Sequence, residues 1–234
     1  MRFIGIGVGP GDSSLLTLKA VECLKKVDVL LAASSEKSGK SYSLEIVKKY
    51  LTPKTEVIKA FFTMSDNKNE TVNVYDRYAD LVNEHVNRGK DVGFLCIGDP
   101  LLYGTYGRLI SIIKSKYPDI IIETIPGITS FSAASSKMNR VIAMDDDYLA
   151  VLPAYKYENV IKIGKPDSLI LMKVYKDREK IINFLKKYGF NRDILYAENV
   201  GLEDEYFSTS FDNVLLRNEK YLSLLFAKKE LFIE

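Results

Sequence analysis

Tryptophan is absent from this sequence of 234 residues, and histidine and cysteine are scarce. The single histidine, His85, lies in a polar helical stretch where we predict a solvated surface position, which argues against a Ser-His-Asp or Cys-His mechanism. The two cysteines, Cys23 and Cys96, form no CxxC pair, so neither a zinc site nor a disulfide framework is expected. Scarce, unpaired cysteine is typical of a reducing compartment, and we expect a cytoplasmic protein.

Long hydrophobic runs and an excess of one charge are also missing. No apolar run approaches the roughly 20 residues of a membrane-spanning helix, and the first residues resemble a strand, so we expect neither a membrane span nor a signal peptide. The 33 basic and 31 acidic residues nearly balance, which argues against nucleic acid as a partner and is compatible with a small anionic substrate. Asp145, Asp146 and Asp147 are expected to form a solvated turn, and no metal site is predicted.

Apolar strand patterns and amphipathic helix patterns alternate along the first half, as in βαβ units with a parallel sheet. The second half has more strands than helices, which predicts a mixed sheet. We predict an α/β fold of two α/β domains, residues 1–122 and 123–234, with a cofactor cleft between them. The predicted strands are 2–8, 27–33, 91–97, 120–125, 148–153, 168–175, 193–200 and 221–229. The predicted helices are 14–26, 43–50, 72–88, 106–116, 129–138 and 178–188.

The loop "GIGVGPGD" after the first predicted strand is rich in glycine, which raises the question of a nucleotide site. The dinucleotide fingerprint G-x-G-x-x-G fails in every register, because Pro10, Asp12 or Ser14 stands where the last glycine belongs. Pro10 also removes a backbone N–H that would face a pyrophosphate. We therefore reject a dinucleotide site.

A second nucleotide pattern is weaker. Gly39-Lys40-Ser41 matches the end of a P-loop, but Ser34 occupies the position of the first glycine, whose conformational freedom the loop needs. An exposed polar loop is the simpler interpretation, and an NTP-binding protein remains a remote alternative.

Three loops that follow predicted strands carry glycine and proline together. They contain Gly9-Pro10-Gly11-Asp12, Gly98-Asp99-Pro100 and Pro126-Gly127-Ile128. Loops at the carboxyl ends of strands line the ligand crevice of an open α/β sheet, so the three can share one crevice.

With these motifs in this order, the sequence resembles the tetrapyrrole methyltransferases, which methylate porphyrin precursors from S-adenosylmethionine. The resemblance extends over nearly the full chain and implies the two-domain class III methyltransferase fold, a homodimer and no metal held by the protein. The stretches "LILMKVYKDREKI" and "ENVGLEDE" resemble the subgroup that methylates C-20 of precorrin-2 or cobalt-factor II in cobalamin biosynthesis. Another corrin-ring methyltransferase, acting at a different carbon, remains an alternative.

The resemblance also implies roles for individual residues. The first domain would supply loops on the tetrapyrrole side, and the second would contribute to the S-adenosylmethionine site. The implied cofactor contacts, mostly main-chain, are Pro10, Ile97, Gly98, Asp99, Leu102, Thr129, Ser130, Met172, Lys173, Val200 and Gly201. The candidate substrate contacts are Gly9, Gly11, Asp12, Tyr103, Arg108 and Arg140, the two arginines as partners of substrate carboxylates.

The implied reaction places few demands on side-chain chemistry. The methyl group is already activated by a sulfonium and the acceptor carbon is itself nucleophilic, so alignment and exclusion of water are the main tasks. Asp99 and Tyr103 are candidates for accepting the proton that the methylated carbon loses, and no catalytic residue is assigned. A non-catalytic tetrapyrrole-binding or S-adenosylmethionine-binding module is a further alternative. Whether the substrate carries cobalt stays open.

Overall fold

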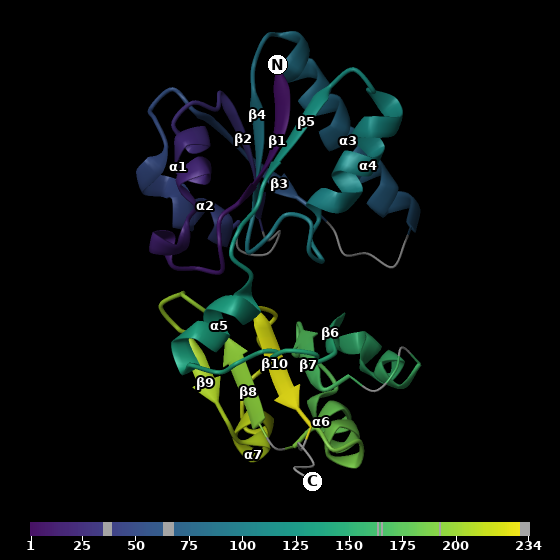
Figure 1. Cartoon of the computed structure of the whole chain (residues 1–234). Coiled ribbons are helices and arrows are strands. Elements are labelled where there is room, and N and C mark those ends of the chain that lie inside the picture. Colours follow the sequence, from purple (N-terminus) through teal and green to yellow (C-terminus); the bar gives the residue numbers. More distant parts are fainter. Residues whose placement is uncertain (35–38, 63–67, 163, 165, 192, 230–234) are drawn as a thin grey trace. The chain divides into compact units, whose positions relative to one another are not determined.

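Each half of the chain folds around its own sheet (Figure 1). The computed structural model describes residues 1–34, 39–62, 68–162, 164, 166–191 and 193–229. The chain forms two α/β units, Met1–Thr129 and Ser130–Glu234, in agreement with the predicted α/β class. The predicted boundary at 122/123 lies too early. It falls inside strand β5 (Ile121–Ile125), which pairs with strand β1 (Arg2–Gly7) and so belongs to the first unit.

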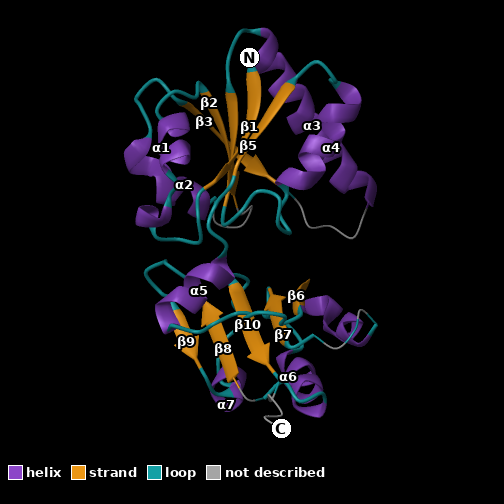
Figure 2. Ribbon diagram, in the orientation of Figure 1, coloured by secondary structure: helices purple, strands orange, loops and turns teal. Residues whose placement is uncertain are grey.

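The first unit has a parallel sheet with helices on both faces (Figure 2). The strand order is β3-β2-β4-β1-β5, and every neighbouring pair is parallel. Helices α1 and α2 cover one face, and helices α3 and α4 cover the other. The bounds of these elements are β2 (Val29–Ser34), β3 (Glu56–Phe61), β4 (Val92–Cys96), α1 (Leu18–Leu24), α2 (Tyr42–Val47), α3 (Lys68–Asn87) and α4 (Tyr106–Lys116). Because β1 and β4 are covered on both faces, their sequences read as continuous apolar runs.

Gly5 in the middle of β1 has a packing role. A Cβ atom at Gly5 would lie 2.7 Å or less from ring atoms of Tyr106, the first residue of α4. The fully buried Tyr106 ring occupies that space, and its hydroxyl lies 2.9 Å from Thr124 Oγ1 on β5. The glycine therefore lets α4 anchor directly against the centre of the sheet.

The second unit has a mixed sheet of order β6-β7-β10-β8-β9. β6 and β7 are parallel, and the other neighbouring pairs are antiparallel. Helices α6 and α7 pack on one face of this sheet, over a core that includes Leu171, Tyr196 and Leu225, and α5 contacts β10. The bounds are β6 (Leu149–Pro153), β7 (Ser168–Met172), β8 (Asp193–Glu198), β9 (Tyr206–Ser208), β10 (Ser223–Lys228), α5 (Ser130–Met138), α6 (Arg178–Lys187) and α7 (Phe211–Leu215).

Several predicted elements differ from those observed. The helix predicted over 14–26 is divided into a 3-10 turn, Ser13–Leu15, capped by Asp12, and α1, capped by the Thr17 hydroxyl. Strands β3 and β9, helix α7 and the 3-10 segment Ala154–Ile161 were not predicted. The helix predicted over 43–50 is observed as α2 followed by a 3-10 turn, Lys48–Tyr50. β3 and β9 are edge strands with few buried side chains, so their alternation of apolar and polar residues is weak.

The prediction that His85 is a solvated surface residue is wrong. The side chain is 6% exposed, and its Nδ1 has no hydrogen-bond partner among the described residues. His85 follows Tyr78 and Val82 at helical spacing, so it lies on the buried stripe of α3. The polar neighbours in the sequence belong to the other face of the helix.

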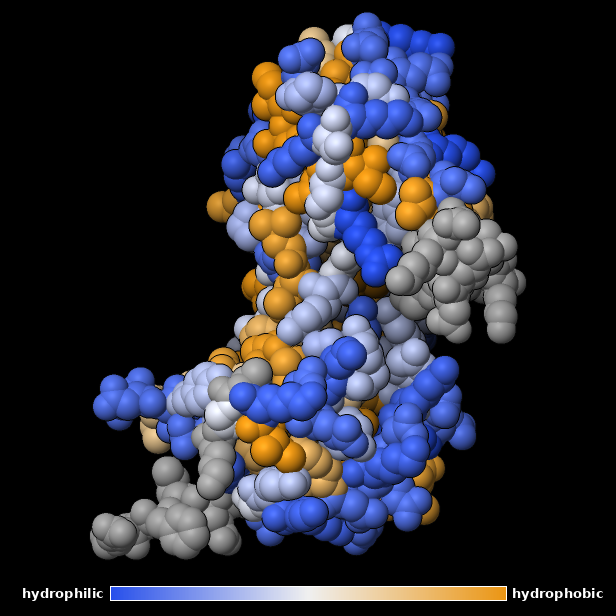
Figure 3. Space-filling model, turned by 90° about the vertical axis from the view of Figure 1, so that its right-hand side faces the viewer, coloured by the Kyte–Doolittle hydropathy of each residue, from blue (hydrophilic) through white to orange (hydrophobic). Residues whose placement is uncertain are grey.

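Hydrophilic side chains cover much of the face shown in Figure 3, interrupted by smaller apolar areas. In the part of the chain that the structure describes, no helix is long and apolar enough to span a membrane. The predicted turn at Asp145–Asp147 is observed, with Asp145 at φ 43° and the Asp147 carboxylate 3.1 Å from Lys228 Nζ.

Candidate functional site

The three glycine-proline loops meet at the carboxyl edge of the first sheet. β1 lies between β4 and β5, so the loops that follow these three strands are neighbours. The Val8 N–H donates to the Cys96 carbonyl at 2.9 Å, and the Gly98 N–H donates to the Gly9 carbonyl at 2.8 Å. An antiparallel bridge between Gly9 and Gly98 thus joins the first loop to the second.

Glycine allows these loops to touch backbone to backbone. A Cβ at Gly127 would lie 2.9 Å from the Gly7 carbonyl carbon and closer still to the Gly98 carbonyl oxygen. A Cβ at Gly7 would in turn lie 2.7 Å from the Cα of Gly127. A real Cβ is essentially never closer than 3.0 Å to a heavy atom outside its own and the adjoining residues, so a side chain at either position would push the loops apart. Gly9 and Gly98 also adopt φ angles of 73° and 70°, which favour glycine.

Asp99 connects the second loop to the third. Its Oδ1 accepts the Leu101 N–H at 2.9 Å, and its Oδ2 accepts the Gly127 N–H at 3.1 Å. Hydrogen bonds from backbone N–H groups to a carboxylate are stronger than those between neutral groups. Oδ2 of this candidate proton acceptor therefore already joins the second loop to the third, and Oδ1 holds the turn within the second loop. The geometry thus supports Asp99 mainly as a residue that positions backbone.

The other predicted residues of this edge lie on the same loops. Pro10 is buried, and Asp12 accepts the Ser14 N–H at 2.8 Å. Tyr103 is 41% exposed with φ 50°, a conformation uncommon for a tyrosine. The Leu102 N–H donates to the Asp99 carbonyl, which continues the turn. Ile97, Gly11 and Thr129 are partly buried on these segments.

The two predicted substrate arginines do not join these loops. Arg108 is exposed on α4 and, with Tyr75, lines a shallow cavity of about 370 Å³ between α3 and α4. Arg140 pairs at 2.9 Å with Asp193, the first residue of β8. The carboxyl end of β8 carries the predicted Val200 and Gly201, so Arg140 lies toward the opposite end of that strand.

A second group of predicted residues gathers at one edge of the second sheet. β7 and β8 are both antiparallel to β10, so their carboxyl ends lie on either side of the start of β10. The Lys173 N–H donates to the Ser223 carbonyl at 2.6 Å, and the Asn199 N–H donates to the Leu222 carbonyl at 2.8 Å. The predicted pairs Met172-Lys173 and Val200-Gly201 are therefore brought together.

Helix α5, which begins at Ser130, is tied to the same edge. The Glu205 carboxylate accepts the Gly201 N–H at 2.7 Å and pairs with Lys137 of α5 at 2.6 Å. Gly201 adopts φ 78°. The loop after β8 is thus held to α5 by one carboxylate.

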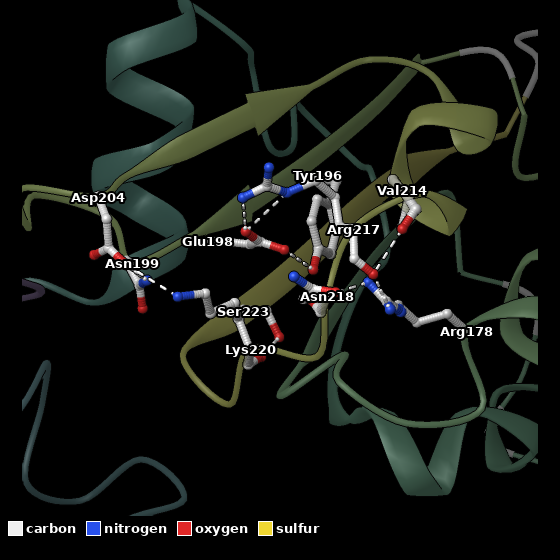
Figure 4. Close-up of polar contacts among 10 residues, drawn as sticks. All are labelled: Arg178, Tyr196, Glu198, Asn199, Asp204, Val214, Arg217, Asn218, Lys220 and Ser223. Carbon is white, nitrogen blue, oxygen red and sulfur yellow. Dashed lines mark hydrogen bonds and ion pairs between the residues drawn. The ribbon is translucent and has the colours of Figure 1, made fainter.

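Sequence reasoning missed a buried polar network at this edge (Figure 4). Glu198, the last residue of β8, is fully buried and accepts hydrogen bonds from the Tyr196 hydroxyl at 2.8 Å and from Arg217 Nη2 at 2.8 Å. Burial, together with the Glu198 carboxylate, raises the pKa of Tyr196. The hydrogen bond with Glu198 raises the pKa of Arg217. In the sequence, the one feature that could have indicated this network is a glutamate, Glu198, at the end of an apolar strand pattern.

The P-loop alternative has no support from the described part of its segment. The Ser41 hydroxyl caps α2 by accepting the Leu44 N–H, and it lies 3.2 Å from Ser43 Oγ in a buried position. A P-loop serine would instead hold a magnesium ion. Residues 35–38 of the pattern lie outside the described residues. Among the described residues, no group of three or more His, Cys, Asp or Glu side chains could hold a metal ion.

Open parallel α/β sheets commonly carry a ligand site at the carboxyl ends of their strands, which is where the three loops of the first sheet lie. The model of the Tetrapyrrole (Corrin/Porphyrin) Methylases matches residues 2–212, and the chain belongs to this family. The resemblance carried by the three motifs is thereby confirmed.

Individual relatives give finer detail. The chain is 34% identical over 206 residues to the cobalt-precorrin-2 C(20)-methyltransferase of Salmonella typhimurium, covering 87% of this chain and 86% of that protein. It is 32% identical over 208 residues to the precorrin-2 C(20)-methyltransferase of a Sinorhizobium species, covering 84% and 83%. A Thermus thermophilus uroporphyrin-III C-methyltransferase, solved with S-adenosylhomocysteine, shares the fold with a TM-score of 0.70 at 20% identity, covering 97% of each chain.

Proposed function

We propose that this protein methylates C-20 of precorrin-2 or its cobalt-bearing counterpart, with S-adenosylmethionine as the methyl donor, in cobalamin biosynthesis. The observation that carries this proposal is the 34% identity over nearly the whole length of a cobalt-precorrin-2 C(20)-methyltransferase. The assembled signature loops support it, since they bring the residues of the family motifs to one edge of the first sheet. A corrin-ring methyltransferase acting at another carbon is less favoured, because the two relatives named above act at C-20.

The residues present fit the cofactor. Gly98 is buried, but the nearest heavy atom to a Cβ built on it is the Ile128 carbonyl oxygen at 3.9 Å, so there is space beside its backbone in that direction. Ile97 and Asp99 are partly exposed, so a ligand at this edge can contact the main chain of the loop. In the second unit, Lys173 and Gly201 present strand ends with positive φ that are tied to fixed neighbours. We propose Ile97, Gly98 and Asp99 of the first unit, and Lys173 and Gly201 of the second, as residues that contact S-adenosylmethionine.

When bound, the cofactor supplies a methyl group activated by a sulfonium. The protein then has to align that group with the substrate carbon and exclude water, which in well-oriented systems lowers the barrier by about 7–11 kcal/mol. Rigid loops suit this task, and Asp99 with the Gly7–Gly127 contact provides the rigidity. Tyr103, exposed on the second loop, stays our candidate for a substrate contact. His85 takes no part, because it lies near the end of α3, which leads to the amino end of β4.

We further propose a cytoplasmic homodimer, on the basis of family resemblance and of the scarce, unpaired cysteines. Light scattering coupled to size-exclusion chromatography measures the mass of the particle in solution. A mass of one chain would contradict the dimer.

The reaction is tested by incubating the purified protein anaerobically with S-adenosylmethionine and either precorrin-2 or cobalt-factor II. We expect the product mass to rise by one methyl group replacing one hydrogen, and NMR to locate the new carbon at C-20. Isothermal titration with S-adenosylhomocysteine and with ATP separates the alternatives. Binding of ATP alone would favour the NTP-binding interpretation, and cofactor binding without methylation of either substrate would favour a non-catalytic module or another ring position.

A further inference from the structure

Glu198 is a charged side chain in an unusual place. It is the last residue of β8, on the same face as the core residues Ile194 and Tyr196, and it is 0% exposed. Its Oε1 accepts the Tyr196 hydroxyl, and its Oε2 accepts both Nε and Nη2 of Arg217, at 3.2 Å and 2.8 Å. Figure 4 shows the hydroxyl and the guanidinium pointing at the carboxylate. Every polar atom of the carboxylate is thus engaged.

Arg217 belongs to a segment that is anchored a second time. The Arg178 guanidinium donates to three carbonyls at the end of α7 and just beyond it, those of Val214, Arg217 and Asn218. The Arg217 guanidinium also stacks on the Tyr206 ring of β9, 4.0 Å from its centroid. The start of the segment that leads into β10 is therefore held by charged groups from β8 and α6.

The far end of this segment carries the contacts to both predicted cofactor strand ends. The carbonyls of Leu222 and Ser223 accept the N–H groups of Asn199 and Lys173. Lys220, in between, pairs with Asp204 at 3.1 Å, and Asp204 also accepts the Asn199 side-chain amide at 2.9 Å. A displacement of Arg217 would thus be transmitted along a short chain segment to the backbone at the ends of β7 and β8.

We propose that Glu198 is a positioning residue for the cofactor: through Arg217 it fixes the 217–223 segment and thereby the backbone around Lys173 and Val200-Gly201. This inference rests on the proposed function of those strand ends. A contribution to stability does not by itself explain the network of Tyr196, Glu198 and Arg217, because a buried ion pair stabilises a protein little more than apolar side chains of the same volume. Its distinctive property is directionality, since two hydrogen bonds from one guanidinium fix the orientation of the partner.

Two variants separate positioning from stability. Glu198→Gln keeps the shape and removes the charge. The triple change Tyr196→Phe, Glu198→Leu and Arg217→Met replaces the network with apolar groups and leaves no buried polar atom of the three without a partner. The matched control is Asp147→Asn, which breaks the ion pair with Lys228 at the other end of β10. Thermal unfolding, the Kd for S-adenosylhomocysteine, and KM and kcat for S-adenosylmethionine are measured for all four proteins.

We expect Glu198→Gln and the triple variant to bind S-adenosylhomocysteine about tenfold more weakly than the wild type, a difference of about 1.4 kcal/mol. KM for S-adenosylmethionine should rise with Kd while kcat changes less, and the triple variant should melt no lower than the wild type. A merely structural role would instead lower the active fraction, and so kcat, without changing KM. The control should bind as the wild type does.

Wild-type affinity in a stably folded triple variant would overturn the inference and leave the proposed function intact. Failure of both network variants to fold would also overturn it, because the group would then be required for folding itself. Failure of the wild type to bind S-adenosylhomocysteine would refute the proposed function first, and this inference with it.

Discussion

Replacing Gly127 with alanine tests whether contact between the loops maintains the binding edge. The new Cβ would stand 2.9 Å from the Gly7 carbonyl carbon and closer to the Gly98 oxygen, whereas real Cβ contacts begin at 3.0 Å. Backbone atoms surround it, so no side chain can rotate away and the loops themselves must separate. The Gly127 N–H would then move relative to the Asp99 carboxylate that accepts it at 3.1 Å.

The expected magnitude follows from this geometry. Overpacking a filled site costs about 1–3 kcal/mol of unfolding free energy. A displacement of about 1 Å in groups that position a substrate lowers catalysis by about 10²-fold. We therefore expect a melting temperature several degrees lower, and kcat/KM for S-adenosylmethionine lower by about two orders of magnitude.

Gly107→Ala is the matched control. It is the same substitution in the same unit, in the first turn of α4, and a Cβ there meets nothing within 4 Å. Alanine also favours a helix, so this variant should be as stable as the wild type or slightly more so. Differential scanning calorimetry and steady-state kinetics compare the three proteins. If Gly127→Ala had the kcat/KM and the melting temperature of the wild type, the close contact of Gly127 with Gly7 and Gly98 would be refuted.

Three further predictions concern groups away from the loops. His85→Ala should lower the unfolding free energy by about 1–3 kcal/mol, because it truncates a buried side chain. The Kd for S-adenosylhomocysteine should not change. A changed Kd at unchanged stability would contradict the placement of His85 in the core, away from the cofactor. Burial raises the pKa of Asp91, but its hydrogen bonds and ion pair with Arg2 outweigh burial and lower the pKa overall. The Asp91 carboxylate thus stabilises the fold above its ordinary pKa, and this stabilisation is lost as the pH falls through the lowered value. Urea unfolding should show Asp91→Asn less stable than the wild type at neutral pH and equal to it in acid, and an equal deficit at both pH values would count against the pair. Burial raises the pKa of Cys23 to about 11 and raises the pKa of Cys96 further. Neither thiol should therefore react with a maleimide near neutral pH unless the protein is first unfolded. A maleimide adduct on the native protein, detected by mass spectrometry, would contradict this prediction.

The amino-acid sequence alone determined the order of most strands and helices, because each is a local pattern. The apolar runs of β1 and β4 and the amphipathic α4 are examples, and the predicted helix over 106–116 coincides with α4. The three loop motifs and the family were also readable from local residues. The predicted surface position of His85 was wrong because the polar residues around it in sequence lie on another face of the helix.

Only the tertiary structure decided which residues meet. The placement of β1 between β4 and β5 brings Gly7, Gly98 and Gly127 into backbone contact, although they are separated by long stretches of sequence. The same holds for Glu198 and Arg217, whose pairing depends on the fold of β8 against the segment before β10. Local patterns specify which face of an element is apolar, whereas strand order and long-range contacts depend on the packing free energy of the whole sheet. The residue types at both loop edges could therefore be predicted from the sequence, whereas the contacts that assemble each edge depend on the tertiary structure.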